Sequence, residues 1–195
     1  MSFDVIHPLK RATGIFIANI AAYLAGIVIA VLGSVLIVTV APFIYGLYYM
    51  AIKGTRGEEV KIKDVFYGFS STDMFTRTWV GFIGFGFVFF IVISLSLIGR
   101  LLDMAVLFSF LSLVVCFILL IFLYFTPYIY VMTPSKNIIY AIKESVRIGK
   151  TNIVMTILTI LVAAIFLIFL VTAPIGLVFA VYVLKGLEPS IKDSS

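Results

Sequence analysis

Hydrophobic residues occur along this chain in four long runs that contain no charged side chain. These runs cover residues 13–52, 78–99, 104–135 and 151–184. A helix that crosses a bilayer needs about 20 apolar residues at a rise of about 1.5 Å each. The second and third runs therefore each predict one membrane-spanning helix, whereas the first and fourth are too long for a single straight span.

Both of the longest runs contain residues that interrupt helices. Proline lacks a backbone donor and clashes with the preceding turn, so that a helix kinks or stops there. The residues at which we expect breaks are Pro42, Gly46, Pro174 and Gly176. If each long run is a hairpin of two short spans, the chain crosses the membrane six times. If each is one kinked helix, it crosses four times.

The distribution of basic residues favours six spans. Cytoplasmic loops carry an excess of Lys and Arg, and six spans place every basic cluster on one side together with both termini. We therefore predict an all-α, polytopic transmembrane helical bundle in the cell membrane, with residues 1–195 as a single integral membrane domain and both termini cytoplasmic. The predicted segments are residues 14–33, 35–53, 78–99, 104–132, 152–170 and 172–185. The alternative has four segments, two of them long and Pro-kinked.

Two segments between the runs, residues 59–77 and 135–150, are amphipathic. We expect both to be interfacial elbow helices that lie flat on the cytoplasmic leaflet. Six basic residues in or beside them are expected to form one collar on anionic lipid headgroups: Arg56, Lys61, Lys63, Lys143, Arg147 and Lys150. Tyrosines concentrated near the same ends of the spans predict an interfacial aromatic belt.

A short internal repeat accompanies the two prolines. Pro42 and Pro174 each follow a Val-Thr and an Ala, and each precedes a Lys-Gly pair at the same distance, Lys53-Gly54 and Lys185-Gly186. A duplication of this kind fits the repeats of transporters. It fits equally well a structural repeat that has no role in transport.

Three stretches resemble uncharacterised membrane-protein families related to the membrane domain of glycerophosphoryl diester phosphodiesterases. They are residues 42–46 (PFIYG), residues 53–69 (KGTRGEEV followed by DVFYGF) and residues 141–152 (AIKESVRIGKTN). The last two are similar to elbows written R-G-E-x-V…D-L-F-x-G-F and A-L-K-x-S-x-R-L-x-K-x-N in those families. The resemblance implies about six membrane segments and no established activity. We therefore do not expect phosphodiesterase activity in this chain.

Composition and charge narrow the classes of protein that fit. Hydrophobic residues make up 63% of the chain and charged residues 12%, against about 45–50% and 25% in soluble domains. These values exclude a soluble globular enzyme and a disordered chain. The net charge of +5 comes from residues that flank apolar runs. We therefore expect membrane lipids with anionic headgroups as partners, no nucleic acid, and otherwise a second copy of the chain or a membrane-complex partner.

The sequence lacks the patterns of catalytic and metal sites. His7 is the single histidine and Cys116 the single cysteine, too few for a metal site or an intramolecular disulfide. The apolar runs contain no Asp, Glu, Lys, Arg or His of the kind that marks ion and proton paths. We therefore predict no enzymatic activity, no cofactor and no metal.

Two functions remain open at this point. The first is a non-enzymatic integral membrane protein with a structural, lipid-interacting or complex-subunit role. The alternative is a small transporter or channel for an apolar or uncharged solute, which the Pro and Gly breaks at repeated positions suggest. A polar cavity lined by Asn19, Thr39, Ser94 and Thr172 would favour the transporter, and a dry bundle would favour the first function.

Overall fold

The computed structural model describes residues 5–133, 137–168 and 172–187, and every regular element within them is helical. This confirms the predicted all-α class. The elements, in chain order, are α1 (Ile6–Ala18), α2 (Ile20–Gly33), α3 (Ile37–Thr55), the 3-10 helix η1 (Ile62–Phe69), α4 (Thr72–Leu101), α5 (Ala105–Leu123), α6 (Thr126–Met132), α7 (Ile138–Thr151), α8 (Ile153–Ile168) and α9 (Ala173–Leu187).

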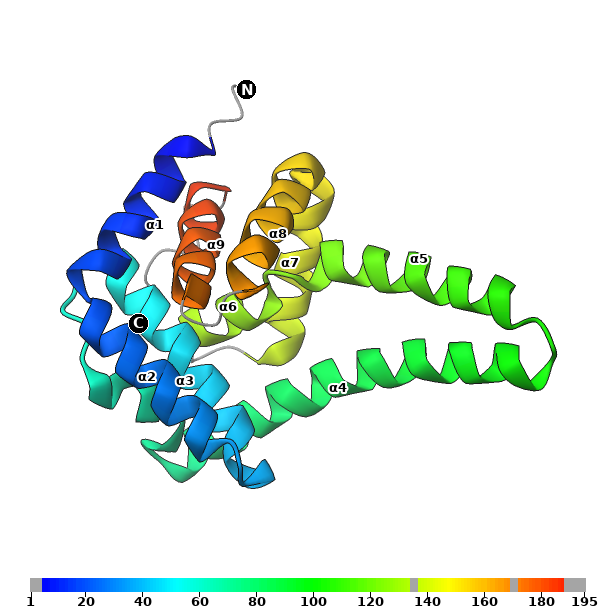
Figure 1. The fold of residues 1–195 in the computed structure, drawn as a ribbon, viewed down its shortest axis with the longest axis horizontal. Helices are drawn as coiled ribbons and strands as arrows, with labels where there is room; N and C mark the ends of the chain where they lie inside the picture. The colour runs from blue at the N-terminus through cyan, green and yellow to red at the C-terminus, as the bar shows by residue number, and fades with distance from the viewer. Residues whose placement is uncertain (1–4, 134–136, 169–171, 188–195) are drawn as a thin grey trace.

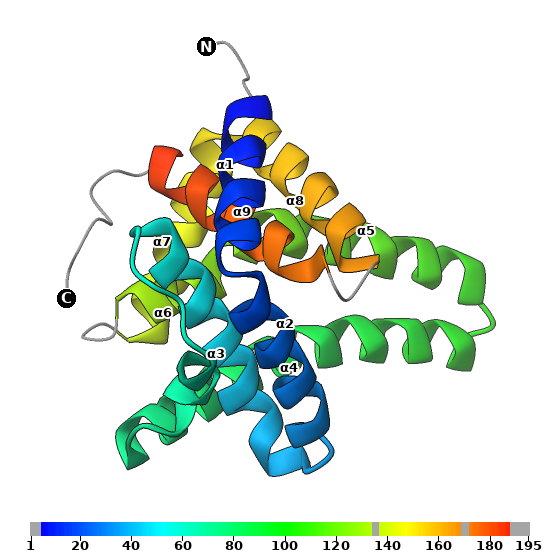
Figure 2. The same cartoon turned by 60° about the vertical axis from the view of Figure 1, so that its left-hand side comes forward.

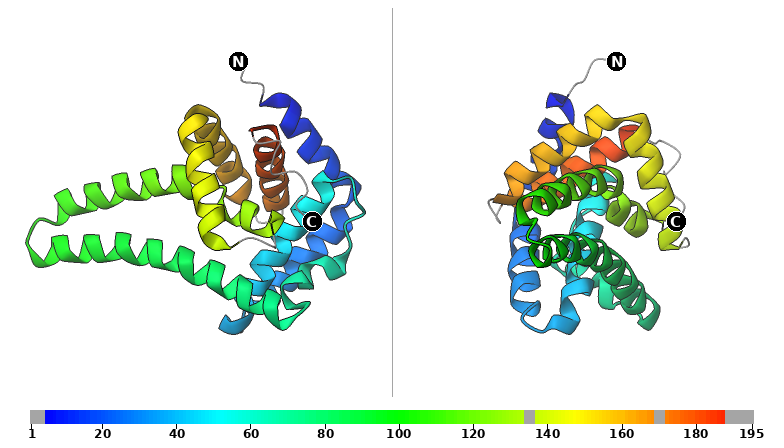
Figure 3. Two further views of the ribbon diagram at one scale, coloured as in Figure 1. Left: turned by 180° about the vertical axis from the view of Figure 1, so that it is seen from behind. Right: turned by 90° about the vertical axis from the view of Figure 1, so that its right-hand side faces the viewer.

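The helices form a packed body from which one long hairpin, α4 and α5, projects (Figure 1). The other views show the same projection (Figures 2 and 3). α4 has 30 residues and is about 45 Å long. Its first turns contact α3 and η1, and its second half lies alongside α5. The Ser96 hydroxyl donates to that of Ser112 at 2.9 Å across the hairpin, which ties the two helices together far from the body.

Two helix pairs of the body bend at an asparagine. α1 meets α2 at Asn19 with a bend of 82°, and α7 meets α8 at Asn152 with a bend of 107°. α3 follows the first bent pair in the chain, and α9 follows the second. Near the start of each of these helices a threonine hydroxyl, Thr39 or Thr172, donates to the carbonyl oxygen six residues earlier. The unit α1–α2–α3 thus recurs as α7–α8–α9, and the short sequence repeat has a structural counterpart.

The closest contact in the body joins α3 to η1. A Cβ atom at Gly46 of α3 would collide with the backbone carbonyl of Val65, and one at Gly68 of η1 would collide with that of Pro42. The two backbones therefore touch at two points where only glycine fits. Phe43 closes the same crossing with a ring centroid 5.0 Å from that of Phe69 in η1.

Several tyrosines of the predicted belt pack against one another inside the body. The Tyr49 ring stacks on Tyr67 with centroids 3.7 Å apart, and Tyr48 meets Tyr128 edge-on at 4.7 Å. Tyr23 is almost completely buried, and its hydroxyl donates to the carbonyl of Met50 at 3.1 Å. Tyr23, which lies outside the predicted belt, thus joins α2 to α3, and the other four rings link α3, η1 and α6.

Fewer helices than predicted are long and apolar enough to cross a membrane. Among the described residues there are two, Ile37–Thr55 and Ala105–Met132, or up to four if each bent pair is counted as one span. The predicted six are not reached because the bend at Asn19 divides the predicted segment 14–33 and leaves α2 with only 14 residues. In addition, α8 and α9 have only 16 and 15 residues, against the roughly 20 that a straight span needs.

We predict that Gly46→Ala and Gly68→Ala destabilise the protein by about 1–3 kcal/mol or more, because the added methyl groups force the α3 and η1 backbones apart. Gly14→Ala is the matched control, since a Cβ at this helical glycine has no neighbour within 4 Å. It should be neutral or stabilising by up to about 1 kcal/mol. The measurement is unfolding in mixed micelles followed by helical circular dichroism. Equal effects of all three substitutions would contradict the crossing.

Candidate functional site

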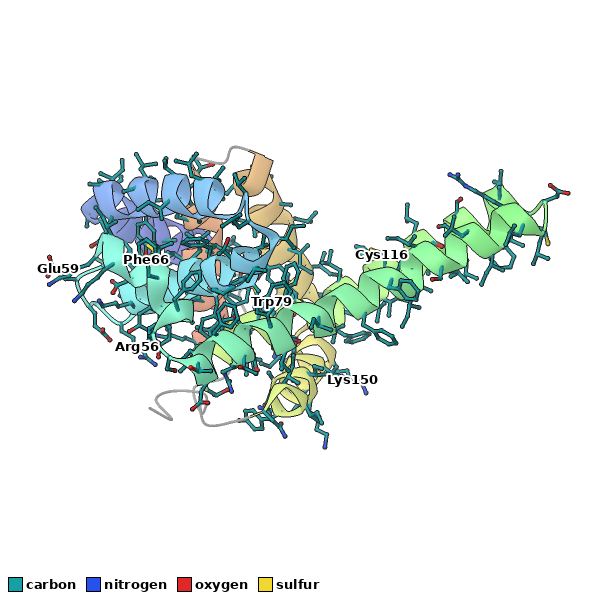
Figure 4. All side chains as sticks on the ribbon, turned by 90° about the horizontal axis from the view of Figure 1, so that it is seen from below. Arg56, Glu59, Phe66, Trp79, Cys116 and Lys150 are labelled. Atoms are coloured by element: carbon teal, nitrogen blue, oxygen red, sulfur yellow. The ribbon has the colours of Figure 1, made fainter. Side chains whose placement is uncertain are left out.

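The six basic headgroup candidates fall into two groups on different elements. Arg56, Lys61 and Lys63 lie at the end of α3 and the start of η1, and Lys143, Arg147 and Lys150 lie on α7. Figure 4 shows Arg56 and Lys150 well apart, with the first turns of α4 between them in this view. The expectation that all six form one collar on lipid headgroups therefore remains a prediction.

Ion pairs within each segment hold some of these cations. Lys61 pairs with Glu59 at 3.1 Å, and Arg147 pairs with Glu144 at 2.7 Å on the α7 surface. The Lys61–Glu59 pair is exposed, and an exposed pair of this kind contributes little stability, whereas in the second pair Arg147 is exposed and Glu144 is partly buried. Lys63, Lys143 and Lys150 are exposed as well. The two groups thus place cationic side chains at the surface of the predicted elbows, where a headgroup could reach them.

α7 buries a narrower face than its apolar pattern predicts. Ser145 and Gly149 lie against the end of α5, where the Ser145 hydroxyl donates to the Phe122 carbonyl at 2.8 Å. Ile139 and Ile142 remain exposed. α7 therefore has a packed small-residue face, an exposed apolar face and a basic face, which suits a helix that lies between a protein body and a lipid surface.

A buried ion pair that sequence reasoning missed fixes the first elbow. Lys53 near the end of α3 pairs with Asp64 of η1 at 2.8 Å, and both side chains are mostly buried. The same carboxylate accepts a hydrogen bond from the Lys61 backbone amide at 2.7 Å, which caps the first turn of η1. The signal was present in the sequence, because Lys53 and Asp64 flank a loop between two apolar segments, but spacing alone does not choose among the nearby cations.

Arg77 joins α4 to the end of α6. Its guanidinium donates to the carbonyls of Tyr130 and Thr133 at 2.6 and 2.9 Å, and lies 3.8 Å from the centre of the Tyr130 ring. The Tyr130 hydroxyl donates back to the Arg77 carbonyl at 3.1 Å. Carbonyls at a helix end lack intrahelical donors and favour a cation, so Arg77 has a structural role at the base of the hairpin.

The prediction that Pro42 breaks its helix is wrong. Helix α3 begins at Ile37 and continues through Pro42. A proline leaves the carbonyl four residues earlier, here that of Val38, without its usual backbone donor. The Trp79 indole of α4 donates to this carbonyl at 3.2 Å. A side chain from another helix thus replaces the missing hydrogen bond. The break in this run lies earlier, in the turn between Gly33 and Ile37.

The other three positions at which we predicted breaks are Pro174, Gly176 and Gly46. The proline lies at the start of a helix, and the two glycines lie at close contacts between helices. Pro174 is the second residue of α9, where its missing N–H is tolerated. Gly176 lies inside α9, and a Cβ there would meet the Ala163 backbone of α8 at 3.2 Å. Gly46 lies inside α3 against η1. Only Pro174 therefore adjoins a helix boundary, and the two glycines serve close helix contacts.

Two apolar cavities adjoin these elements. The larger, of about 410 Å³, lies between α2, α3 and the start of α9 and includes Pro174 in its wall. The smaller, of about 230 Å³, lies between α3, α4 and α6. Ile44 and Tyr48 of α3 line both, so one strip of α3 separates the two spaces.

Comparison of the chain with models of protein families, with curated proteins and with solved structures gives no match. The resemblance to the phosphodiesterase-related membrane families therefore rests on the three stretches that carry it. Residues 42–46 and most of residues 53–69 form the α3–η1 crossing, and residues 141–152 form most of α7 and its bend.

We predict that Trp79→Phe lowers the free energy of unfolding by about 1 kcal/mol, the value of one hydrogen bond. In a Pro42→Ala background the same substitution should cost less, because the backbone N–H that alanine restores at this position can donate to the Val38 carbonyl. The double-mutant cycle, measured by unfolding in mixed micelles, isolates this coupling. An equal cost in both backgrounds would show that the indole does not compensate for the proline.

We predict that Asp64→Asn destabilises the protein by about 3 kcal/mol, because it leaves the Lys53 ammonium mostly buried without its counter-charge. The asparagine keeps an oxygen for the Lys61 amide, so the change isolates the charge. Glu59→Gln is the control, since it removes a carboxylate from an exposed pair and should cost less than about 0.5 kcal/mol. If the two variants unfold alike, the Lys53–Asp64 pair is not a structural link.

Proposed function

We propose that this chain is a non-enzymatic integral membrane protein that interacts with lipid through the projecting α4–α5 hairpin and the two basic elbows. The observation that carries the proposal is the hairpin itself. It projects from the body, and its outward side chains are apolar along most of its length (Figure 4). An 18-residue stretch within Ala105–Met132 has a mean hydropathy of 3.1, and only 11% of this stretch is buried.

A bilayer accounts for this exposure better than water does. Leu101 and Val106 are 84% and 86% exposed, and Phe110 and Leu113 are also exposed. Soluble proteins rarely leave apolar patches of this extent uncovered. The uncharged part of α4, residues 78–99, corresponds to about 33 Å of helix, close to the roughly 30 Å of a hydrocarbon core. The hairpin therefore has the length and the surface of a two-helix membrane insertion.

The ends of the hairpin support an orientation. The turn at its tip carries one cation and one anion, Arg100 and Asp103, whereas its base lies beside the basic elbows. Positive charge is favoured on the cytoplasmic side, where anionic lipids attract it. We therefore place the elbows at the cytoplasmic leaflet and the tip at the opposite face.

The transporter alternative is less well supported. The polar side chains that would line a transport path form hydrogen bonds with backbone groups instead. The Asn19 side-chain oxygen accepts from the Val60 amide, and its nitrogen donates to the Ile15 carbonyl. The hydroxyls of Thr39 and Thr172 donate to the backbone carbonyls of Gly33 in α2 and Phe166 in α8. The two cavities described above are lined almost entirely by apolar side chains.

We predict that the hairpin crosses the membrane. The test is the labelling of single cysteines introduced into a Cys116→Ala background. In sealed cells, Asp103→Cys should react with a membrane-impermeant maleimide from outside, because the tip emerges there. Lys61→Cys and Lys143→Cys should react only after the cells are opened. Extraction of the membranes with alkaline carbonate provides the second measurement, and the protein should stay in the pellet. Labelling of all three positions from one side, or release by carbonate, would overturn the proposal.

A further inference from the structure

Helix α7 lies at the base of the hairpin, where α5 ends. α5 has 19 residues and is about 28 Å long, close to the roughly 30 Å of a hydrocarbon core. The Ser145 hydroxyl of α7 donates to the Phe122 carbonyl in the last turn of α5, and a Cβ at Gly149 would lie 3.1 Å from the Ile121 carbonyl oxygen. In the proposed function the hairpin spans the bilayer, so α7 lies at the depth of the lipid headgroups.

The packed face of α7 determines which of its side chains face outward. The buried residues of the helix are Ala141, Ser145, Ile148 and Gly149. The opposite arc carries two exposed isoleucines and three exposed cations: Ile139, Ile142, Lys143, Arg147 and Lys150. Lys143 follows Ile139 by four positions, so a cationic and an apolar side chain are neighbours on this arc. Figure 4 shows Lys150 on α7, turned away from the packed body. Such an arc can place apolar side chains among acyl chains and ammonium groups among headgroups.

The cations of α7 have little negative charge around them. Glu144 is the single acidic residue of the helix, and it pairs with Arg147 at 2.7 Å. Within the part of the chain that the structure describes, Lys143 and Lys150 take part in no ion pair. The helices on which α7 packs, namely α5, α6 and α8, contain no Asp or Glu. With three basic residues and one acidic residue, α7 therefore keeps a net charge of +2.

The first elbow has no such excess of positive charge. Between the end of α3 and the first turn of α4, residues 53–73 contain four basic and four acidic side chains: Lys53, Arg56, Lys61, Lys63, Glu58, Glu59, Asp64 and Asp73. Two of these cations are paired, Lys53 with Asp64 and Lys61 with Glu59. The next cation along the chain, Arg77, donates to carbonyls at the end of α6. The two elbows thus carry three of the six basic candidates each but differ in net charge.

We propose that α7 binds anionic phospholipid of the membrane and gives the protein a preference for anionic over zwitterionic headgroups, to which the first elbow contributes nothing. The inference rests on the proposed function, which places α7 at headgroup depth. The occupant is a phospholipid and not dissolved phosphate, because the cations adjoin exposed isoleucines that only a lipid surface would cover. Each cation near an anionic surface raises the affinity about fivefold, and the two unpaired lysines of α7 share one arc of the helix.

The test measures lipid preference separately at each element by fluorescence quenching. Trp79 is the single tryptophan of the chain, and Trp79→Phe gives a background without native signal. Ile139→Trp on α7, Phe66→Trp on η1 and Phe110→Trp on the hairpin then each report one exposed position. Each full-length variant is reconstituted in vesicles of phosphatidylcholine and phosphatidylglycerol in which one or the other lipid has brominated acyl chains. The ratio of quenching by the two brominated lipids gives the local preference.

We expect the Ile139→Trp reporter to show a preference for phosphatidylglycerol of about fivefold or more at low salt. The preference should fall toward one at 1 M salt, where charges are screened beyond about 3 Å. The Phe66→Trp and Phe110→Trp reporters should show ratios near one. An equal preference at the Phe66 and Ile139 positions, or one at Ile139 that salt does not reduce, would overturn the proposal.

Paired charge variants show whether the lysines of α7 cause the preference. Lys143→Gln combined with Lys150→Gln should bring the ratio of the Ile139→Trp reporter close to one. Lys61→Gln combined with Lys63→Gln is the matched control, since it removes two cations from the first elbow and should leave the ratio unchanged. Lys143→Arg combined with Lys150→Arg keeps the charge and should keep the preference. Circular dichroism checks that every variant is folded. A ratio that is the same in the α7 glutamine variant and in the unchanged protein contradicts the assignment to α7.

The Phe110→Trp reporter separates this inference from the proposed function. If brominated lipids quench it but the Ile139→Trp reporter shows no preference or no quenching, the α7 site is wrong and the membrane location of the hairpin stands. If neither brominated lipid quenches the Phe110→Trp reporter, the hairpin does not lie in the hydrocarbon, and the proposed function fails together with the inference that depends on it.

Discussion

The close crossing of α3 and η1 is the contact on which the rest of the body depends. Backbone meets backbone at Gly46 and Gly68, where a single methyl group would separate the helices. Next to this contact, the Asp64 carboxylate binds Lys53 and caps η1. The rings of η1 then pack onto α3, with Tyr67 stacked on Tyr49. Because α4 starts at Thr72, shortly after η1 ends, the crossing also sets the direction in which the hairpin leaves the body.

A second constraint is that backbone groups freed by turns and prolines need donors from elsewhere in the chain. In hydrocarbon an unpaired carbonyl costs several kcal/mol, and the helix ends of this protein are served by side chains from distant elements. The Trp79 side chain donates a hydrogen bond to the Val38 carbonyl, and the Ser145 side chain donates one to the Phe122 carbonyl. The Arg77 side chain donates to the carbonyls of Tyr130 and Thr133. Each of these bonds also ties two elements together. These three polar side chains therefore contribute to the assembly of the helices.

The helical class and the approximate segment bounds were predictable because they follow from local properties. The predicted segment 35–53 matches α3, and the segments at 152–170 and 172–185 correspond to α8 and α9 within a few residues. The bend at Asn19 was not predictable, since one polar residue inside an apolar run does not change its hydropathy, whereas the bend at Asn152 lies at the predicted boundary between the elbow 135–150 and the segment 152–170. The continuous helix at Pro42 depends on Trp79, which lies far away in sequence. Likewise, Gly46 and Gly176 are explained by partners that only the fold brings near.

The two repeated units show how one local pattern gives two outcomes. In each, a threonine hydroxyl donates to the carbonyl six residues earlier, and a proline lies early in the third helix. In the first unit η1 packs over the Pro42 carbonyl through Gly68, so this surface is covered. In the second unit Pro174 lines the cavity between the units instead. The difference comes from what packs on the helix and not from the proline.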